Sequence, residues 1–158
     1  LLFKNIVSET GNLLKQAKKN YRLKDVTTPF EEARKHLIEV TRYFGLKSIT
    51  EDFMTPILYA SPYLELFGDV AIGFMLLWQA VIADRRLDEL YSDAKADTQE
   101  KKDELLRTNR SAAFYRGKVA SAEFFANTIL SLAPGKARAI MSGERSAIDL
   151  PEESFALV

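Results

Sequence analysis

Residues 70–83 read VAIGFMLLWQAVIA, an apolar run that Gln79 interrupts and that Asp69 and Asp84 close at its two ends. The run is shorter than the roughly 20 apolar residues that a membrane-spanning helix needs. It lies in the middle of a predicted helix over residues 62–91, and its apolar side chains cover nearly every face of that helix. Because such a helix has to be covered on all sides, we expect this segment to be surrounded by companion helices.

Two amphipathic patterns in the N-terminal half predict two further helices. In the first, apolar side chains recur at steps of three and four residues from Phe3 to Tyr21, and basic residues crowd the last turns, where they suit the helix dipole. The second follows Thr28 and Pro29, a typical start with a capping threonine and a proline in the first turn, and Gly45 is the expected stop. Its expected buried stripe consists of Phe30, Ala33, Leu37, Val40 and Phe44.

A fourth long helix is predicted over residues 111–132, ended by Pro134 and Gly135. One side of this pattern is rich in small residues, which would let a neighbouring helix come close. That side consists of Ala113, Gly117, Ala120, Phe124 and Thr128. We also interpret Gly68 and Gly73, in the third helix, as positions of close packing rather than ligand contact.

The remaining segments are shorter or irregular. Short helices are predicted within residues 48–60 and 136–141, and the charge-dense stretch 93–110 is interpreted as a solvated connection or a projecting hairpin tip. The tail from Ser142 onward is expected to be irregular and to tuck three apolar side chains against the bundle. These are Ile148, Leu150 and Phe155. The prediction is an all-α fold: an antiparallel four-helix bundle with a short extra helix and an irregular C-terminal tail.

Composition and length narrow the class of protein. The chain has 158 residues, 47% hydrophobic and 28% charged, which is typical of one soluble globular domain over residues 1–158. Acidic and basic residues balance at 22 each, so neither nucleic acid nor a membrane surface is an expected partner. Without cysteine there is no disulfide or thiolate site, in keeping with a reducing cytosol. Because the first residue is Leu1 and helical spacing begins at once, we expect a fragment of a larger chain.

A search for chemistry finds no complete catalytic, cofactor-binding or metal-binding motif. A di-iron bundle needs two Glu-x-x-His pairs, whereas the single histidine, His36, has Ala33 three residues before it. We interpret His36, flanked by Glu32 and Glu39, as structural or solvated. No serine stands in a G-x-S-x-G setting, and neither G-x-x-x-x-G-K-[ST] nor G-x-G-x-x-G occurs. We therefore predict no catalytic, cofactor-binding or metal-binding residue in this chain.

Two groups of side chains allow both a binding and a structural interpretation. The aromatic residues of the two strongest helices follow the helical stripes, and we interpret them as core. They are Trp78, Phe114, Tyr115, Phe124 and Phe125. Arg116 and Lys118 either meet an anionic cofactor phosphate or form a solvated face or an ion pair with a neighbouring domain, and the sequence leaves both alternatives open.

Two stretches resemble the C-terminal domain of the longer acyl-CoA dehydrogenases. Residues 63–83, YLELFGDVAIGFMLLWQAVIA, begin with the Tyr-Leu-x-Leu-Phe-Gly pattern of that family. Residues 114–132, FYRGKVASAEFFANTILSL, contain its Lys-x-Ala-x-Ala-x-Phe-Phe pattern. The tail is similar as well, with a serine-glycine turn at Ser142 and Gly143 and an acidic-Phe ending at residues 152–155. The resemblance covers most of the chain, although its motifs are packing motifs.

The resemblance implies a parent enzyme that uses FAD to oxidise an acyl-CoA thioester to the 2,3-enoyl-CoA. In that family the catalytic glutamate belongs to a Tyr-Glu-Gly-Thr motif, which is missing from this sequence. The family's FAD and acyl-CoA pockets are formed mainly by upstream domains, so no cofactor is expected in this fragment. The implied partners are the upstream catalytic domains of the same chain within a cytoplasmic homo-oligomer. The alternative is a free-standing helical interaction module unrelated to flavin chemistry.

Overall fold

The computed structural model describes residues 2–50 and 52–156, and the described residues form helices and turns without a β-strand. This confirms the predicted all-α class. In chain order the elements are α1 (Leu2–Ala17), the 3-10 helix η1 (Tyr21–Leu23), α2 (Lys24–Ser48), α3 (Met54–Leu58), α4 (Ala60–Asp93), α5 (Gln99–Thr108), α6 (Arg110–Thr128), η2 (Leu130–Leu132), α7 (Ala133–Met141) and η3 (Glu152–Phe155).

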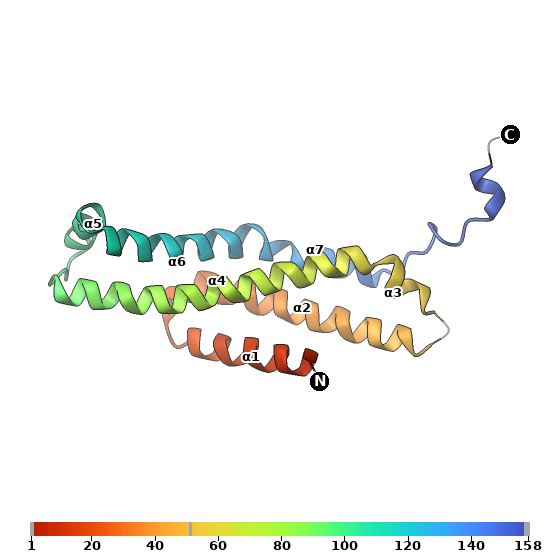
Figure 1. The fold of residues 1–158 in the computed structure, drawn as a ribbon, viewed down its shortest axis with the longest axis horizontal. Helices are drawn as coiled ribbons and strands as arrows, with labels where there is room; N and C mark the ends of the chain where they lie inside the picture. The colour runs from red at the N-terminus through yellow and green to blue at the C-terminus, as the bar shows by residue number, and fades with distance from the viewer. Residues whose placement is uncertain (1, 51, 157–158) are drawn as a thin grey trace.

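The core lies between α2, α4 and α6, and α7 continues the line of α6 along α2 (Figure 1). Successive long helices run in opposite directions along one axis (Figure 1). The largest fully buried side chains include Phe30, Leu66, Leu77, Leu130 and Ile140. By contrast, α1 lies along the outside of α2 and α4 and buries only its apolar Leu14 and Ala17 fully, so the four long helices do not share the core equally.

The expectation that residues 70–83 are covered on all sides is wrong. One side of α4 is buried in the core: Val70, Gly73, Leu77, Ala80 and Ala83. The opposite side is exposed: Ile72, Met75, Trp78 and Ile82. The reason is geometric, because α2 and α6 cover one side of α4, α1 borders another, and no other helix described here covers the exposed side.

The start of α2 lies earlier than predicted. The helix begins at Lys24, directly after η1, and Thr28 is an exposed residue inside it rather than its cap. Pro29 has no N–H to donate to the carbonyl four residues before it, at Asp25. The side chain of Asn127 on α6 donates to this oxygen instead, at 3.2 Å. A tertiary hydrogen bond therefore satisfies the carbonyl that Pro29 leaves free. The end of α2 also differs from the prediction, because the helix continues past Gly45 to Ser48.

The small-residue side of α6 does not receive a neighbouring helix. Its members are all exposed, and no atom lies within 4 Å of the position that a Cβ at Gly117 would take. The packed side carries Ala112, Val119, Ala122 and Ala126 instead. Small side chains alone therefore do not select the packed side of α6, which is the side that faces α4 and α2.

Outside the core, the structure refines one expectation, confirms a second and corrects a third. The stretch 93–110 contains α5, a solvated helix capped by the Thr98 side chain, at the end of the α4 and α6 pair (Figure 1). The predicted short helices are confirmed as α3 and α7, and α7 begins at Ala133 because Pro134 occupies its first turn. The tail does not tuck Leu150 and Phe155 against the bundle, since both side chains are exposed.

The two central glycines of α4 differ in their surroundings and predict opposite effects of alanine. A Cβ at Gly73 would lie 2.9 Å from Leu130 Cδ1, whereas no atom lies within 4 Å of one at Gly68, which is therefore not the close-packing position that we expected. Gly68→Ala should raise the free energy of unfolding by about 1 kcal/mol through helix propensity. Gly73→Ala should lower it by about 1 kcal/mol or more, because the core has to shift. Urea unfolding of both variants measures the difference, and equal stabilisation would contradict this packing.

Candidate functional site

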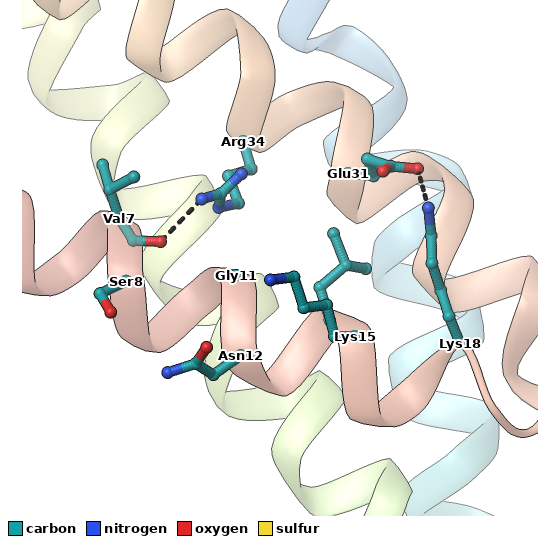
Figure 2. A pocket seen from close by; sticks show the side chains of 9 residues that line it. Val7, Ser8, Gly11, Asn12, Lys15, Lys18, Glu31 and Arg34 are labelled. Carbon is teal, nitrogen blue, oxygen red and sulfur yellow. Dashed lines mark hydrogen bonds and ion pairs between the residues drawn. The ribbon is translucent and has the colours of Figure 1, made fainter.

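A polar cleft of about 340 Å³ lies between α1 and α2. Figure 2 shows Lys15 and Lys18 of α1 at this cleft, together with Glu31 and Arg34 of α2. Lys18 Nζ donates to Glu31 Oε2 across the mouth of the cleft. Both of these side chains are about half exposed, so this ion pair contributes little to stability.

Arg34 connects the two helices at the base of this cleft. Its Nε donates to Thr10 Oγ1 at 2.8 Å, and its Nη2 donates to the Val7 carbonyl at 2.7 Å (Figure 2). Gly11 makes room for the guanidinium, because a Cβ there would lie 3.1 Å from Arg34 Nη2. Two nitrogens of the Arg34 guanidinium thus bind α1, and the arrangement serves to hold α1 on α2.

A second polar cluster fixes the connection between α1 and α2 onto α4. Asp84 is buried and accepts hydrogen bonds from the Asn20 amide and from Arg22, whose Nη2 lies 2.8 Å from Asp84 Oδ2. Hydrogen bonds from Asp84, and then from Asp88, raise the pKa of the Arg22 guanidinium further above its usual range. The Arg22 guanidinium thereby compensates the negative charge of the buried Asp84 carboxylate, and the same ion pair holds η1 against α4.

A third cluster anchors the root of the tail. Asp52 accepts from Lys47 Nζ at 2.8 Å, from Thr55 Oγ1 at 2.8 Å and from Arg145 Nη1. The hydrogen bonds from Lys47 and Thr55, in that order, lower the pKa of the Asp52 carboxyl to about 2. Arg145 also pairs with Asp149 at 3.1 Å. This cluster joins the end of α2, α3 and the chain after α7.

The residues that the sequence singled out are not brought together into one site. His36 Nδ1 lies 2.9 Å from Glu39 Oε2 on the same helix. Within residues 2–50 and 52–156, no group of three or more His, Cys, Asp or Glu side chains is arranged to hold a metal ion. Arg116 donates to Glu123 at 3.1 Å on α6, and Lys118 Nζ lies 5.4 Å from the Phe114 ring centroid.

The interpretation of the aromatic residues as core is wrong for three of the five. Trp78, Phe114 and Phe124 are 50%, 58% and 71% exposed, whereas Tyr115 and Phe125 pack against the core. Ile82 and Phe114 line one shallow depression between α4 and α6. We call the exposed apolar side chains along α4 the α4 face, and they are Leu64, Ile72, Met75, Trp78 and Ile82.

By length and composition, α4 is the one helix of the described chain that could cross a membrane. The apolar run 70–83 is by itself too short to span a bilayer, whereas the whole helix has 34 residues. Central helices of soluble proteins satisfy the same criterion, and α4 contributes one side to a packed core.

The fold is an all-helical domain whose described residues form a packed core on one side of α4. Polar contacts around Arg34, Asp84 and Asp52 attach the outer elements to this core. Residues 4–151 match the model of a family described as acetyl-CoA dehydrogenase C-terminal like. The chain belongs to this family.

One curated relative has a named activity. Over 98 residues the chain is 31% identical to butyryl-CoA dehydrogenase from Syntrophomonas wolfei subsp. wolfei (strain DSM 2245B / Goettingen). The aligned stretch covers 62% of this chain and 14% of the length of that protein, so the chain corresponds to a small part of its relative. No solved structure gives a significant match.

The Arg34 contacts predict a local role that can be measured. Arg34→Ala removes both hydrogen bonds to α1, and we expect it to lower the free energy of unfolding by about 1–2 kcal/mol. Amide hydrogen exchange should accelerate along α1 more than along α6. Lys35→Ala, at an exposed neighbouring position, is the matched control and should change little. Unchanged exchange in α1 of the Arg34 variant would show that the helix is held by other contacts.

The Asp52 cluster predicts release of the tail root in acid. Because the pKa of Asp52 in the folded chain is about 2, below its ordinary value, the tether is intact above about pH 4 and is lost as the pH falls through about 2. Nuclear magnetic resonance relaxation of the Ser146 and Asp149 amides should report the released segment. Asp52→Asn should release it at neutral pH, whereas Asp97→Asn, whose carboxylate pairs with Lys101 near α5, should not.

Proposed function

We propose that this chain is the C-terminal accessory domain of an FAD-dependent acyl-CoA dehydrogenase. In this proposal the other domains of the parent oxidise acyl-CoA to 2,3-enoyl-CoA, and this domain takes no direct part in the chemistry. The family match over residues 4–151 and the likeness to a butyryl-CoA dehydrogenase support the connection. The 14% share of that relative's length supports a domain that works as part of a longer polypeptide.

The α4 face is the observation that carries the proposal. From Ile72 to Ile82 its side chains recur every three or four residues, so they share one side of the helix, and Leu64 lies two turns before Ile72. Phe114 of α6 extends this side at Ile82. Contiguous exposed apolar surface of this kind marks a contact with another protein surface. We assign the contact to the catalytic domains of the parent.

No part of an FAD site is assigned to this chain. The pyrophosphate of FAD needs free donors or cations, whereas Arg34 is committed to Val7 and Thr10, and Lys18 is paired with Glu31. Arg116 is likewise paired with Glu123. These three cations are therefore not assigned to a cofactor, and we place FAD in the upstream domains of the parent.

In this proposal the domain acts through its contact with the catalytic domains and not through catalytic residues of its own. By covering part of the catalytic domains and extending the subunit interface, the domain would stiffen the flavin site indirectly. We further place the parent in the cytoplasm as a homo-oligomer. The encoding sequence upstream of Leu1 offers a direct check, because it should contain the Tyr-Glu-Gly-Thr motif. A stop codon or an unrelated domain there would favour a free-standing interaction module instead.

The proposal predicts that the α4 face is needed in the full-length enzyme. Trp78→Ser combined with Ile82→Ser should weaken the contact between domains roughly tenfold, because central aromatic anchors dominate such contacts. Flavin retention and dehydrogenase activity of the purified enzyme should fall together. Tyr21→Ser, at an exposed aromatic residue outside the α4 face, is the control and should leave both unchanged.

Deletion of the whole domain gives the stronger test of the same proposal. Loss of flavin, of the native oligomer or of activity is expected in the truncated enzyme. If flavin retention, oligomeric state and activity all stay the same, the domain is not an accessory to catalysis.

A further inference from the structure

The last described segment, residues 147–156, leaves the bundle beyond the Asp52 cluster (Figure 1). Leu150 is 50% exposed and Phe155 is 72% exposed. Between them lie Pro151 and the acidic Glu152 and Glu153. An apolar, acidic segment that does not pack on its own bundle has the composition of a docking peptide.

A matching groove of about 420 Å³ lies between α1 and α2. Phe3, Val7 and Ile38 provide its apolar surface, and Lys4 and Arg42 provide its two cations. No carboxylate lines this groove, and none of the ion pairs among the described residues involves Lys4 or Arg42. The groove therefore combines an apolar floor with free positive charge, which complements the tail.

We propose that the tail of one copy of this chain docks in the groove between α1 and α2 of a second copy. Phe155 packs on the floor at Val7 and Ile38, and Glu152 and Glu153 face Lys4 and Arg42. The tail thus supplies an apolar side chain for the floor of the groove and negative charge for its two cations.

The occupant is a second copy because of where the tail leaves the bundle. Arg145 holds the root of the tail at Asp52, and Figure 1 shows the segment directed away from α1. Tail and groove are carried by the same chain, so a two-fold exchange satisfies both copies with two identical contacts. Each contact is small, and the pair reinforces itself because the second docking event occurs within the dimer. The inference concerns this chain alone and stands apart from the proposed role in the parent enzyme.

Sedimentation velocity of the 158-residue chain over a range of concentrations tests the exchange. We expect a dimer that dissociates on dilution and weakens with added salt. Phe155→Ala, and separately Lys4→Glu with Arg42→Glu, should each weaken it roughly tenfold. Lys19→Glu with Arg138→Glu makes the same charge change outside the groove and should leave the dimer intact.

Charge exchange gives the decisive comparison. Glu152→Lys with Glu153→Lys should weaken the dimer by itself and should restore it when combined with Lys4→Glu and Arg42→Glu. Circular dichroism of every variant checks that the helices remain folded, and the restored dimer would exclude misfolding as the cause of the loss.

A synthetic peptide of residues 147–156 tests the groove without relying on the dimer. It should bind a chain that ends at Ser146, and the binding should be lost in the Lys4→Glu, Arg42→Glu variant of that shortened chain. A chain that stays monomeric and does not bind the peptide would overturn the proposal. A dimer that persists after removal of residues 147–158 would also overturn it and would place the interface elsewhere, for example on the α4 face.

Discussion

Gly73 lets the side chain of Leu130 pack directly against the backbone of α4, and the rest of the bundle is arranged around this close contact. A Cβ at Gly73 would also approach Phe30 of α2, to 3.4 Å, so three elements meet at one point of the core. On the facing side of α6, Ala122 and Ala126 are buried and small enough for the helices to lie close together. The central unit is therefore α2, α4 and α6 with η2 and α7, and the remaining elements attach to its outside.

Those outer elements are held by polar contacts rather than by extensive burial. Arg34 fixes α1 through Thr10 and a backbone carbonyl, and Asp84 fixes the turn that follows α1. Asp52 does the same for the root of the tail. Each contact uses a donor and acceptor pair contributed by segments far apart in the chain, and removal of one partner leaves the other unsatisfied. The positions of the outer elements thus depend on a few polar side chains, whereas the core depends on close packing of apolar side chains.

The two sides of α4 are both apolar but differ in burial. One side is used by the core of this chain, and the other presents Leu64, Met75 and Trp78 to its surroundings. Membership in the acetyl-CoA dehydrogenase C-terminal like family and the small share of the relative's length both agree with a domain that is completed by contact with other surfaces. The exposed side of α4 and the family match therefore support the same proposal, in which this chain contributes structure to an enzyme whose chemistry lies elsewhere.

The sequence by itself determined the approximate positions of the long helices and most of the buried stripe of α2, because periodic spacing is a local property of the chain. Phe30, Ala33, Leu37 and Val40 are buried as predicted, whereas Phe44 is only partly buried and packs against the core. Only the tertiary structure decided that α2 begins before Pro29, since the compensating amide of Asn127 comes from α6. It also decided the roles of Arg34 and Asp84, whose partners lie on elements that no sequence pattern places beside them. The exposure of Trp78 was missed for a related reason: apolar spacing shows which side chains need cover, whereas the packing of neighbouring helices determines which of them this chain covers.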